Sequence, residues 1–178
     1  FVLAGALARP WREQSAAARR RRGAAAALAG GLTPFLVFSP PWRPAAVYPH
    51  LLSYFNELGG GPRQGHRILV DSNLDWGQEL KSLARWLSAR GITEPINLCY
   101  FGTADPRYHG IAHLNLTGGY LFEPHVPLEQ AKRPGWLAIS ASHREGAYAR
   151  GVAPWIELLE GAELVDAVGH SIFVYRLK

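Results

Sequence analysis

Methionine is missing from the 178-residue chain, and cysteine occurs once, at position 99. A single cysteine excludes a disulfide framework or a cysteine-based zinc site within the chain. Because Cys99 lies in an apolar run, we expect a small buried strand residue rather than a catalytic thiol. A chain that lacks methionine and begins with phenylalanine is expected to be a fragment or a processed product.

Several sequence motifs that mark enzyme classes are also missing. The chain has no Walker motif and no G-x-G-x-x-G, and the glycine run at 59–61 does not follow an apolar strand. Ser140, Ser142 and His143 are ingredients of nucleophilic catalysis, but no G-x-S-x-G elbow accompanies them. The seven histidines show no metal-ligand spacing. These absences argue against a nucleotide-binding domain, an α/β-hydrolase and a zinc enzyme.

The positive charge is confined to the N-terminal quarter. Residues 1–46 carry seven arginines and one glutamate, a net charge of +6, which leaves −1 for residues 47–178 out of the total of +5. The larger part therefore has no basic footprint of the kind that nucleic-acid binding requires, and no nucleic-acid partner is expected.

Residues 1–46 have the pattern of the end of a membrane region. An arginine-rich stretch at 9–22 precedes eighteen uncharged residues at 23–40. A membrane helix at about 23–41 behind a basic cytoplasmic loop explains both features, since arginines concentrate on the cytoplasmic side of spans. A secretory signal, a soluble alanine-rich helix or a disordered arm remain alternatives. On the membrane interpretation, residues 47–178 form an extracytoplasmic domain.

The centre of this domain is predicted at 67–86. Residues 68–70 are apolar and predict a buried strand. Trp76, Leu80, Leu83 and Leu87 then recur at helical spacing, and Gly91 is typical of a helix C-terminus. A second apolar run at 96–101 completes a predicted βαβ unit with two parallel strands.

The other elements follow from the same signals. A short amphipathic helix is predicted at 48–58, a long loop with short pieces of structure at 113–134, and a third strand at 136–140. A short helix is predicted at 154–159, and strands at 164–168 and 171–175 predict an antiparallel hairpin. The predicted fold is α/β: a mostly parallel open sheet with flanking helices and a C-terminal hairpin, preceded by a membrane helix.

Polar residues after the first two predicted strands are the candidate binding residues, because open sheets bind ligands beyond the carboxyl ends of their strands. Asp105 before Pro106 also predicts a helix start. Asp71 and Asp75 could bind a divalent cation, or else cap the helix and hydrogen-bond the turn. We expect the two groups to meet across a crevice; the candidates are Asp71, Asn73, Asp75, Trp76, Gln78, Asp105, Tyr108 and His109.

Three stretches carry a family resemblance: YPHLLSYFNELGGGP, LVDSNLDWGQELKSLARWL and YFGTADPRYHGI. Together they resemble the C-terminal region of bacterial multi-span glycosyltransferases of the protein-mannosyltransferase-like type. The resemblance covers about residues 45–178. It implies an α/β domain on the extracytoplasmic side of the bacterial inner membrane, tethered to a membrane-embedded N-terminal part that uses a polyprenyl-phosphate-linked sugar.

The family's catalytic acid lies far N-terminal of this region, so no residue is assigned a catalytic role and enzymatic activity of the chain itself is left open. The resemblance implies that the domain helps to bind or orient a substrate of the parent glycosyltransferase. The alternative is a non-catalytic structural or interaction domain that packs on the membrane part or on a partner. No cofactor beyond the possible cation is identified, and the oligomeric state is not predicted.

Overall fold

The computed structural model describes residues 42–146 and 155–178. The chain divides into two compact units, Phe1–Arg43 and Pro44–Lys178, and the second contains the sheet. The predicted basic loop at 9–22 and the predicted membrane helix at about 23–41 lie outside the described residues. Within the described part, α2 (Trp42–Ala45) is the first element, and no helix there is long and apolar enough to span a bilayer.

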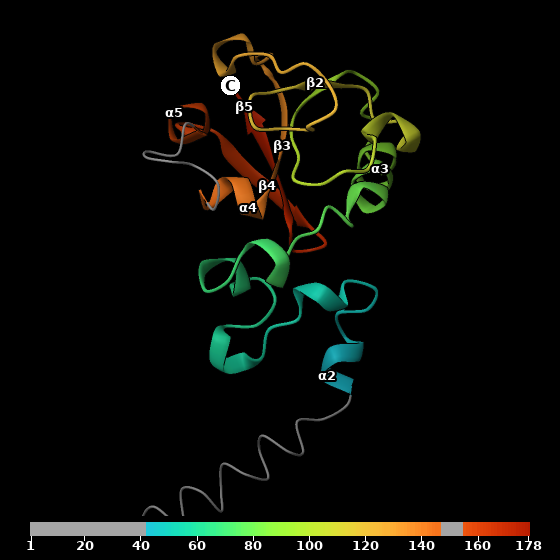
Figure 1. Ribbon diagram of the computed structural model, residues 1–178, viewed down its shortest axis with the longest axis vertical. Helices are drawn as coiled ribbons and strands as arrows, with labels where there is room; N and C mark the ends of the chain where they lie inside the picture. The colour runs from blue at the N-terminus through green and yellow to red at the C-terminus, as the bar shows by residue number, and fades with distance from the viewer. Residues whose placement is uncertain (1–41, 147–154) are drawn as a thin grey trace, which may run out of the picture. The chain divides into compact units, whose positions relative to one another are not determined.

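A five-stranded sheet forms the centre of the second unit (Figure 1). Its strands are β1 (Ile96–Cys99), β2 (His113–Asn115), β3 (Gly135–Ser140), β4 (Glu163–Val168) and β5 (Ile172–Leu177), in the spatial order β2-β1-β3-β5-β4. β1 pairs in parallel with β2 and β3, whereas β5 is antiparallel to both β3 and β4. The predicted α/β class and the edge hairpin are confirmed. The prediction of a mostly parallel sheet is wrong, because the hairpin joins β3 and makes the sheet mixed.

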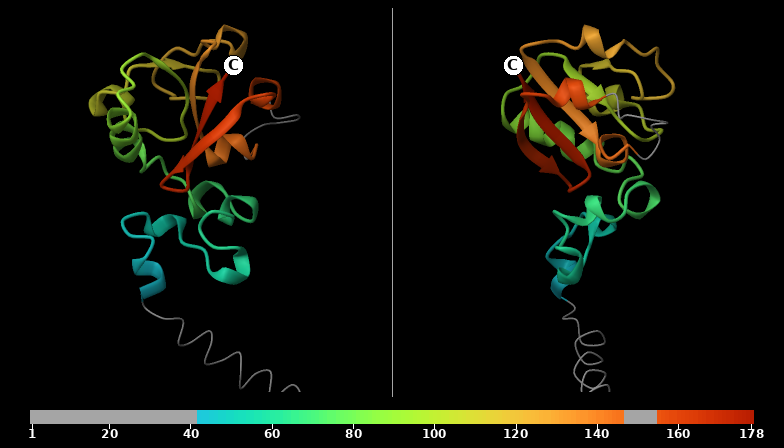
Figure 2. Two further views of the ribbon diagram at one scale, coloured as in Figure 1. Left: turned by 180° about the vertical axis from the view of Figure 1, so that it is seen from behind. Right: turned by 90° about the vertical axis from the view of Figure 1, so that its left-hand side faces the viewer.

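Side chains alternate cleanly between the two faces of the sheet, as a period of two requires. Ile96, Leu98 and Tyr100 point to the face covered by α3 (Leu80–Ala89). Cys99 and its neighbours on β3 and β5 point to the other face, where α4 (Ala141–Arg144) and α5 (Trp155–Leu159) lie. Figures 1 and 2 show these helices on opposite sides of the sheet. The single cysteine is fully buried, as predicted.

The predicted strand at 68–70 is wrong, and with it the predicted βαβ unit. Two short 3-10 helices, η4 (Gly65–Arg67) and η5 (Asp71–Asn73), flank this run instead. Ile68 is 57% exposed and Leu69 is 46% exposed, so the run packs on no sheet. Three consecutive apolar residues do not alternate with polar ones, so the run does not specify which of its faces should be buried. The backbone forms turns on either side of it instead of an extended strand.

The predicted amphipathic helix at 48–58 is also wrong. That segment forms two 3-10 turns, η2 (Leu51–Ser53) and η3 (Glu57–Gly59), and Leu51 and Leu58 are exposed. A short helix depends on a surface that buries its whole apolar face; here Phe55 packs partly buried against the core, while Leu51, Leu52 and Leu58 stay exposed.

Two polar contacts also attach this segment to the turn between β4 and β5 and to the residue before α3. The Ser53 hydroxyl donates to the Gly169 carbonyl at 2.7 Å, and His50 Nδ1 lies 2.8 Å from Glu79 Oε1.

The other local predictions are largely confirmed. α3 ends before Gly91, which has a φ of 63°, although Trp76 lies outside the helix. Asp105 accepts a hydrogen bond from the Arg107 N–H at 2.9 Å and begins η6 (Pro106–His109). The long loop contains β2 and η7 (Leu128–Gln130).

Replacing Leu98 by alanine is expected to lower the free energy of unfolding by about 2–5 kcal/mol, because Leu98 is fully buried at the centre of the sheet. The matched control is Leu164→Ala, since 49% of Leu164 is exposed on the edge strand; it should cost less than about 1 kcal/mol. Urea unfolding followed by tryptophan fluorescence measures both. Equal losses in the two variants would contradict the central position of Leu98.

Candidate functional site

A cleft of about 490 Å³ opens at the carboxyl ends of the three parallel strands. The chain passes from β1 to β2 on one side of β1 and then returns to β3 on the other, so this edge includes the point where strand order reverses. Open α/β sheets bind ligands at such a point. We call this hollow the edge cleft; its lining is mostly apolar and consists of Trp76, Tyr100, Phe101, Gly102, Thr103, Gly118, Gly119, Leu121 and His143.

One buried hydrogen bond holds the wall of the edge cleft in place. The Tyr100 hydroxyl donates to the Gly77 carbonyl oxygen at 2.8 Å, which ties the turn before α3 to the end of β1. The contact requires glycine on both sides: a Cβ at Gly77 or at Gly102 would lie 2.1 or 2.2 Å from the Tyr100 hydroxyl oxygen, and both residues have positive φ. The neighbouring Trp76 is thereby presented at the surface, 63% exposed, as part of the cleft wall.

Asp75 lies behind this wall and is fully buried. Its Oδ1 accepts a hydrogen bond from the Gly77 N–H at 2.9 Å, while its Oδ2 has no hydrogen-bond partner among the described residues. Burial raises the pKa of Asp75 to about 6; the Gly77 N–H and the Ser140 hydroxyl offset part of this rise, and the nearby Glu79 carboxylate adds to it. Asp75 is thus a carboxyl group that titrates close to neutral pH.

His143 forms the opposite side of the cleft, at the start of α4. Its ring packs against Phe101 and Trp155, with centroids 5.7 and 5.9 Å away. Burial lowers the pKa of His143 to about 4, even though a hydrogen bond to the Tyr100 backbone works in the other direction. The imidazole is therefore neutral at pH 7 and offers hydrogen bonds without charge. His143 was not among the predicted binding residues. Its position just after the predicted third strand is the sequence feature that could have indicated it.

The two serines near His143 hold the backbone. Ser140 Oγ accepts from the Phe101 N–H at 3.0 Å, and Ser142 Oγ accepts from the Asp71 N–H at 3.1 Å. Both side chains are buried. These contacts give each hydroxyl a structural role and agree with the missing nucleophile elbow.

Of the first group of predicted residues, only Trp76 lines the cleft. The Gln78 side chain bonds two backbone groups of the turn. Its Oε1 accepts a hydrogen bond from the Trp76 N–H at 2.8 Å, and its Nε2 donates one to the Leu74 carbonyl oxygen. Asn73 is exposed, and Asp71 is half-buried with a φ of 62°. Asp75 and Gln78 thus hydrogen-bond the turn, as in the alternative interpretation, but none of these side chains caps α3, whose N-cap residue is Glu79.

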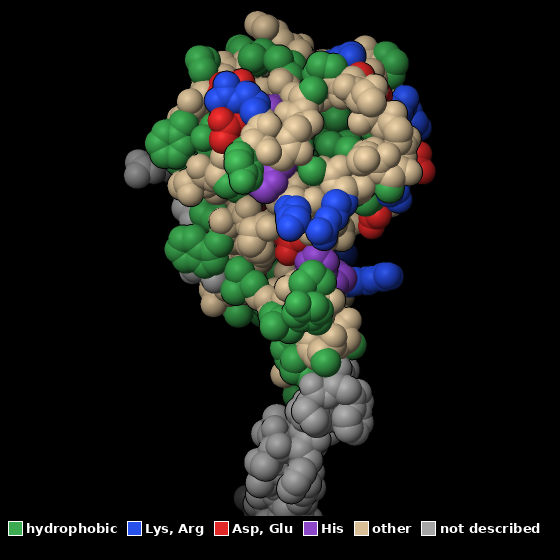
Figure 3. Space-filling view, turned by 90° about the vertical axis from the view of Figure 1, so that its right-hand side faces the viewer, with side chains coloured by type: hydrophobic (Ala, Val, Ile, Leu, Met, Phe, Trp, Pro, Cys, Tyr) green, Lys and Arg blue, Asp and Glu red, His purple; other side chains and the backbone are tan. Residues whose placement is uncertain are grey.

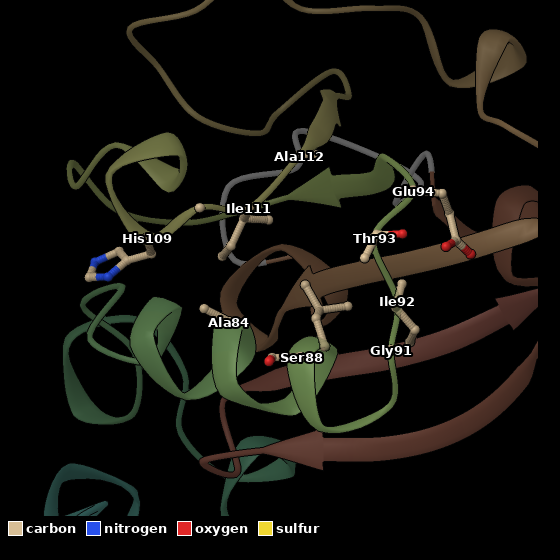
Figure 4. A pocket seen from close by; sticks show the side chains of 11 residues that line it. Ala84, Ser88, Gly91, Ile92, Thr93, Glu94, His109, Ile111 and Ala112 are labelled. Carbon is tan, nitrogen blue, oxygen red and sulfur yellow. The ribbon is translucent and has the colours of Figure 1, made fainter.

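The second group of predicted residues lies elsewhere. His109 lines a separate pocket of about 340 Å³ beside α3, where Figure 4 shows it at one end and Glu94 at the other. Asp105 pairs with Arg107 at 2.8 Å, and these hydrogen bonds lower the pKa of Asp105. Tyr108 is 87% exposed. None of the three is among the residues that line the edge cleft.

The distribution of charge around the site is mixed. On the face in Figure 3, lysine and arginine side chains lie next to acidic ones rather than forming one basic field. Within the described residues, no group of three or more histidine, cysteine, aspartate or glutamate side chains is placed to hold a metal ion.

Asp75→Asn should change how stability depends on pH. The folded pKa of about 6 lies above that of an unfolded aspartate, about 3.9, so wild-type stability falls as the pH rises through this window. The fully ionised carboxylate costs about 3 kcal/mol, and asparagine removes that cost. The free energy of unfolding of the variant, relative to wild type, should therefore increase by up to about 3 kcal/mol between pH 4 and 7.5. A difference that stays constant across these pH values would show that Asp75 does not titrate there.

No protein-family model matches the chain, and neither a curated protein nor a solved structure matches it.

Proposed function

We propose that residues 47–178 form the extracytoplasmic domain of a bacterial membrane glycosyltransferase, and that the edge cleft binds and orients a substrate of the sugar transfer. The donor would be a polyprenyl-phosphate-linked sugar, and the transfer itself would occur in the membrane-embedded part of the same protein. The observation that carries the proposal is the edge cleft, because two of the three stretches that resemble the family supply most of its walls. Trp76 comes from one stretch, and Tyr100, Phe101 and Thr103 come from the other.

The chemistry of the cleft suits a sugar or the first units of its lipid carrier. Small-molecule sites are mostly apolar and aromatic, with a few placed polar groups that set orientation. The exposed Trp76 ring offers a flat apolar surface to the C–H face of a sugar. Thr103 and the neutral His143 supply hydrogen-bonding groups for hydroxyls. No catalytic role is assigned to any of them, since the family's catalytic acid would lie in the membrane part.

A second candidate function is a non-catalytic interaction domain that packs on the membrane part or on a partner. One observation favours it: the segment 48–69, which follows the proposed membrane helix, exposes several large apolar side chains. They are Tyr48, Leu51, Leu52, Leu58, Ile68 and Leu69. Exposed apolar groups concentrated in one segment are typical of surfaces that contact another body.

Trp76→Ala in the full-length parent protein is expected to reduce kcat/KM for sugar transfer at least about tenfold, because it removes the aromatic wall of the cleft. Transfer of radiolabelled sugar from polyprenyl-phosphate donors, assayed in membranes, measures this. Phe122→Ala is the matched control, since Phe122 is an exposed aromatic outside the cleft lining. Unchanged transfer by Trp76→Ala, with normal expression and membrane insertion, would overturn the proposal.

Leu51→Ser combined with Leu58→Ser tests the second candidate. If the segment packs on another body, the double variant should expose it and increase the rate of trypsin cleavage at Arg63 and Arg67 severalfold in intact membranes. Leu164→Ser serves as control, because Leu164 is an exposed leucine outside this segment. Equal cleavage rates in both variants would argue against packing through residues 48–69.

A further inference from the structure

A cavity of about 570 Å³ lies between the segment around η4, the end of α4 and the β4–β5 hairpin. It shares no lining residue with the edge cleft. We call it the arginine pocket, defined by Arg63, His66, Arg67, Arg144 and His170. Three elements that are far apart in the sequence thus bring three guanidinium groups and two imidazole rings to one hollow.

The positive charges of two of the guanidinium groups are not paired with an acidic side chain among the described residues. The side chains of Arg63 and Arg67 make no hydrogen bond or ion pair with any residue in the described ranges. Arg144 is held in place: its Nε donates to the Tyr175 hydroxyl at 2.7 Å, and its guanidinium lies 4.3 Å from the centre of the Phe173 ring. The pocket therefore has one fixed cation and two that are available to a ligand.

The acidic residues nearby are already engaged. Glu145 pairs with Arg144 at 2.6 Å. Asp166 Oδ2 accepts from the Trp86 Nε1–H at 2.7 Å and lies 3.6 Å from Arg90, while Oδ1 accepts from the Ala167 N–H. Trp86 and Arg90 are at α3, which covers the opposite face of the sheet from Phe173. An excess of positive charge remains in the pocket.

The two histidines fit the same pattern. Burial is the largest cause that lowers the pKa of both His66 and His170. Arg144 and Arg67 add to this effect at His66, where Glu145, 3.7 Å away, opposes it, and His50 and Arg63 add to it at His170. His170 Nδ1 is buried without a hydrogen-bond partner among the described residues, and its backbone has a φ of 62° in the turn between β4 and β5. Their ring nitrogens can still serve as hydrogen-bond donors to an anion held by the arginines.

We propose that the arginine pocket binds a phosphate group. Guanidinium groups pair with phosphate oxygens through two parallel N–H donors, and donors from three elements can surround a tetrahedral anion. The volume of the pocket exceeds that of phosphate alone, so the group would be carried by a larger molecule. The site is independent of the edge cleft, and its failure would leave the proposal for that cleft untouched.

The test uses the purified full chain at pH 7 and constant ionic strength. Two probes are titrated: inorganic phosphate by calorimetry, and phosphatidylcholine vesicles with or without phosphatidic acid by flotation. The first variant is Arg63→Gln with Arg67→Gln; both side chains are exposed, so the fold should survive. The matched control is Lys81→Gln with Arg85→Gln, which removes the same two charges from the exposed side of α3.

Saturable binding that weakens at least tenfold in the pocket variant, and less than twofold in the control, is the expected result. If the pocket variant weakens binding of inorganic phosphate, the ligand is a soluble phosphate compound. If it weakens binding of phosphatidic acid vesicles alone, the ligand is a lipid headgroup. His170→Asn keeps a residue that tolerates positive φ and should weaken binding severalfold. No saturable binding of either probe, or equal losses in the two double variants, would overturn the proposal.

Discussion

The hydrogen bond from the Tyr100 hydroxyl to the Gly77 carbonyl is the contact on which the candidate site depends. It joins the end of β1 to a turn that has no strand pairing of its own. Together with the hydrogen bonds that Asp75 and Gln78 make within the turn, it places Trp76 in the cleft wall and keeps Asp75 buried. The phenol is itself buried, which raises its pKa and keeps it protonated as a donor. Two glycines with positive φ make the approach possible, so the geometry is specified by small residues as much as by the tyrosine.

Charge is arranged unevenly around this contact. The turn and the start of α3 bury two carboxyl groups, of Asp75 and Glu79, and the latter is bonded to His50. On the other face of the sheet, arginines gather around Phe173. An apolar cleft beside a buried acid and a separate cationic pocket are sites for different chemical groups.

The sequence could predict part of the candidate site, because some of its residues follow a local pattern and others are placed by strand pairing. Trp76 was predicted from its place after polar turn residues, and the structure does bring it to the cleft. Gln78 came from the same polar cluster, but its amide bonds backbone groups of the turn, because a polar side chain can satisfy such groups as readily as a ligand. Asn73 is exposed and outside the cleft lining. His143 was missed because its position follows from the pairing of β3 with β1, which no local pattern announces.

The sequence by itself determined the elements whose signals are local: the apolar strands predicted at 96–101, 136–140 and 171–175, which β1, β3 and β5 largely match, the amphipathic α3, and the caps at Asp105 and Gly91. Propensity, periodicity and turn chemistry act within a few residues, so they can be recognised without knowing the fold. Only the tertiary structure decided that 68–70 is no strand, that 48–58 is no helix, and that the hairpin pairs antiparallel with β3. Those outcomes depend on which surfaces are available to bury an apolar face, and that information lies in the partners rather than in the segment.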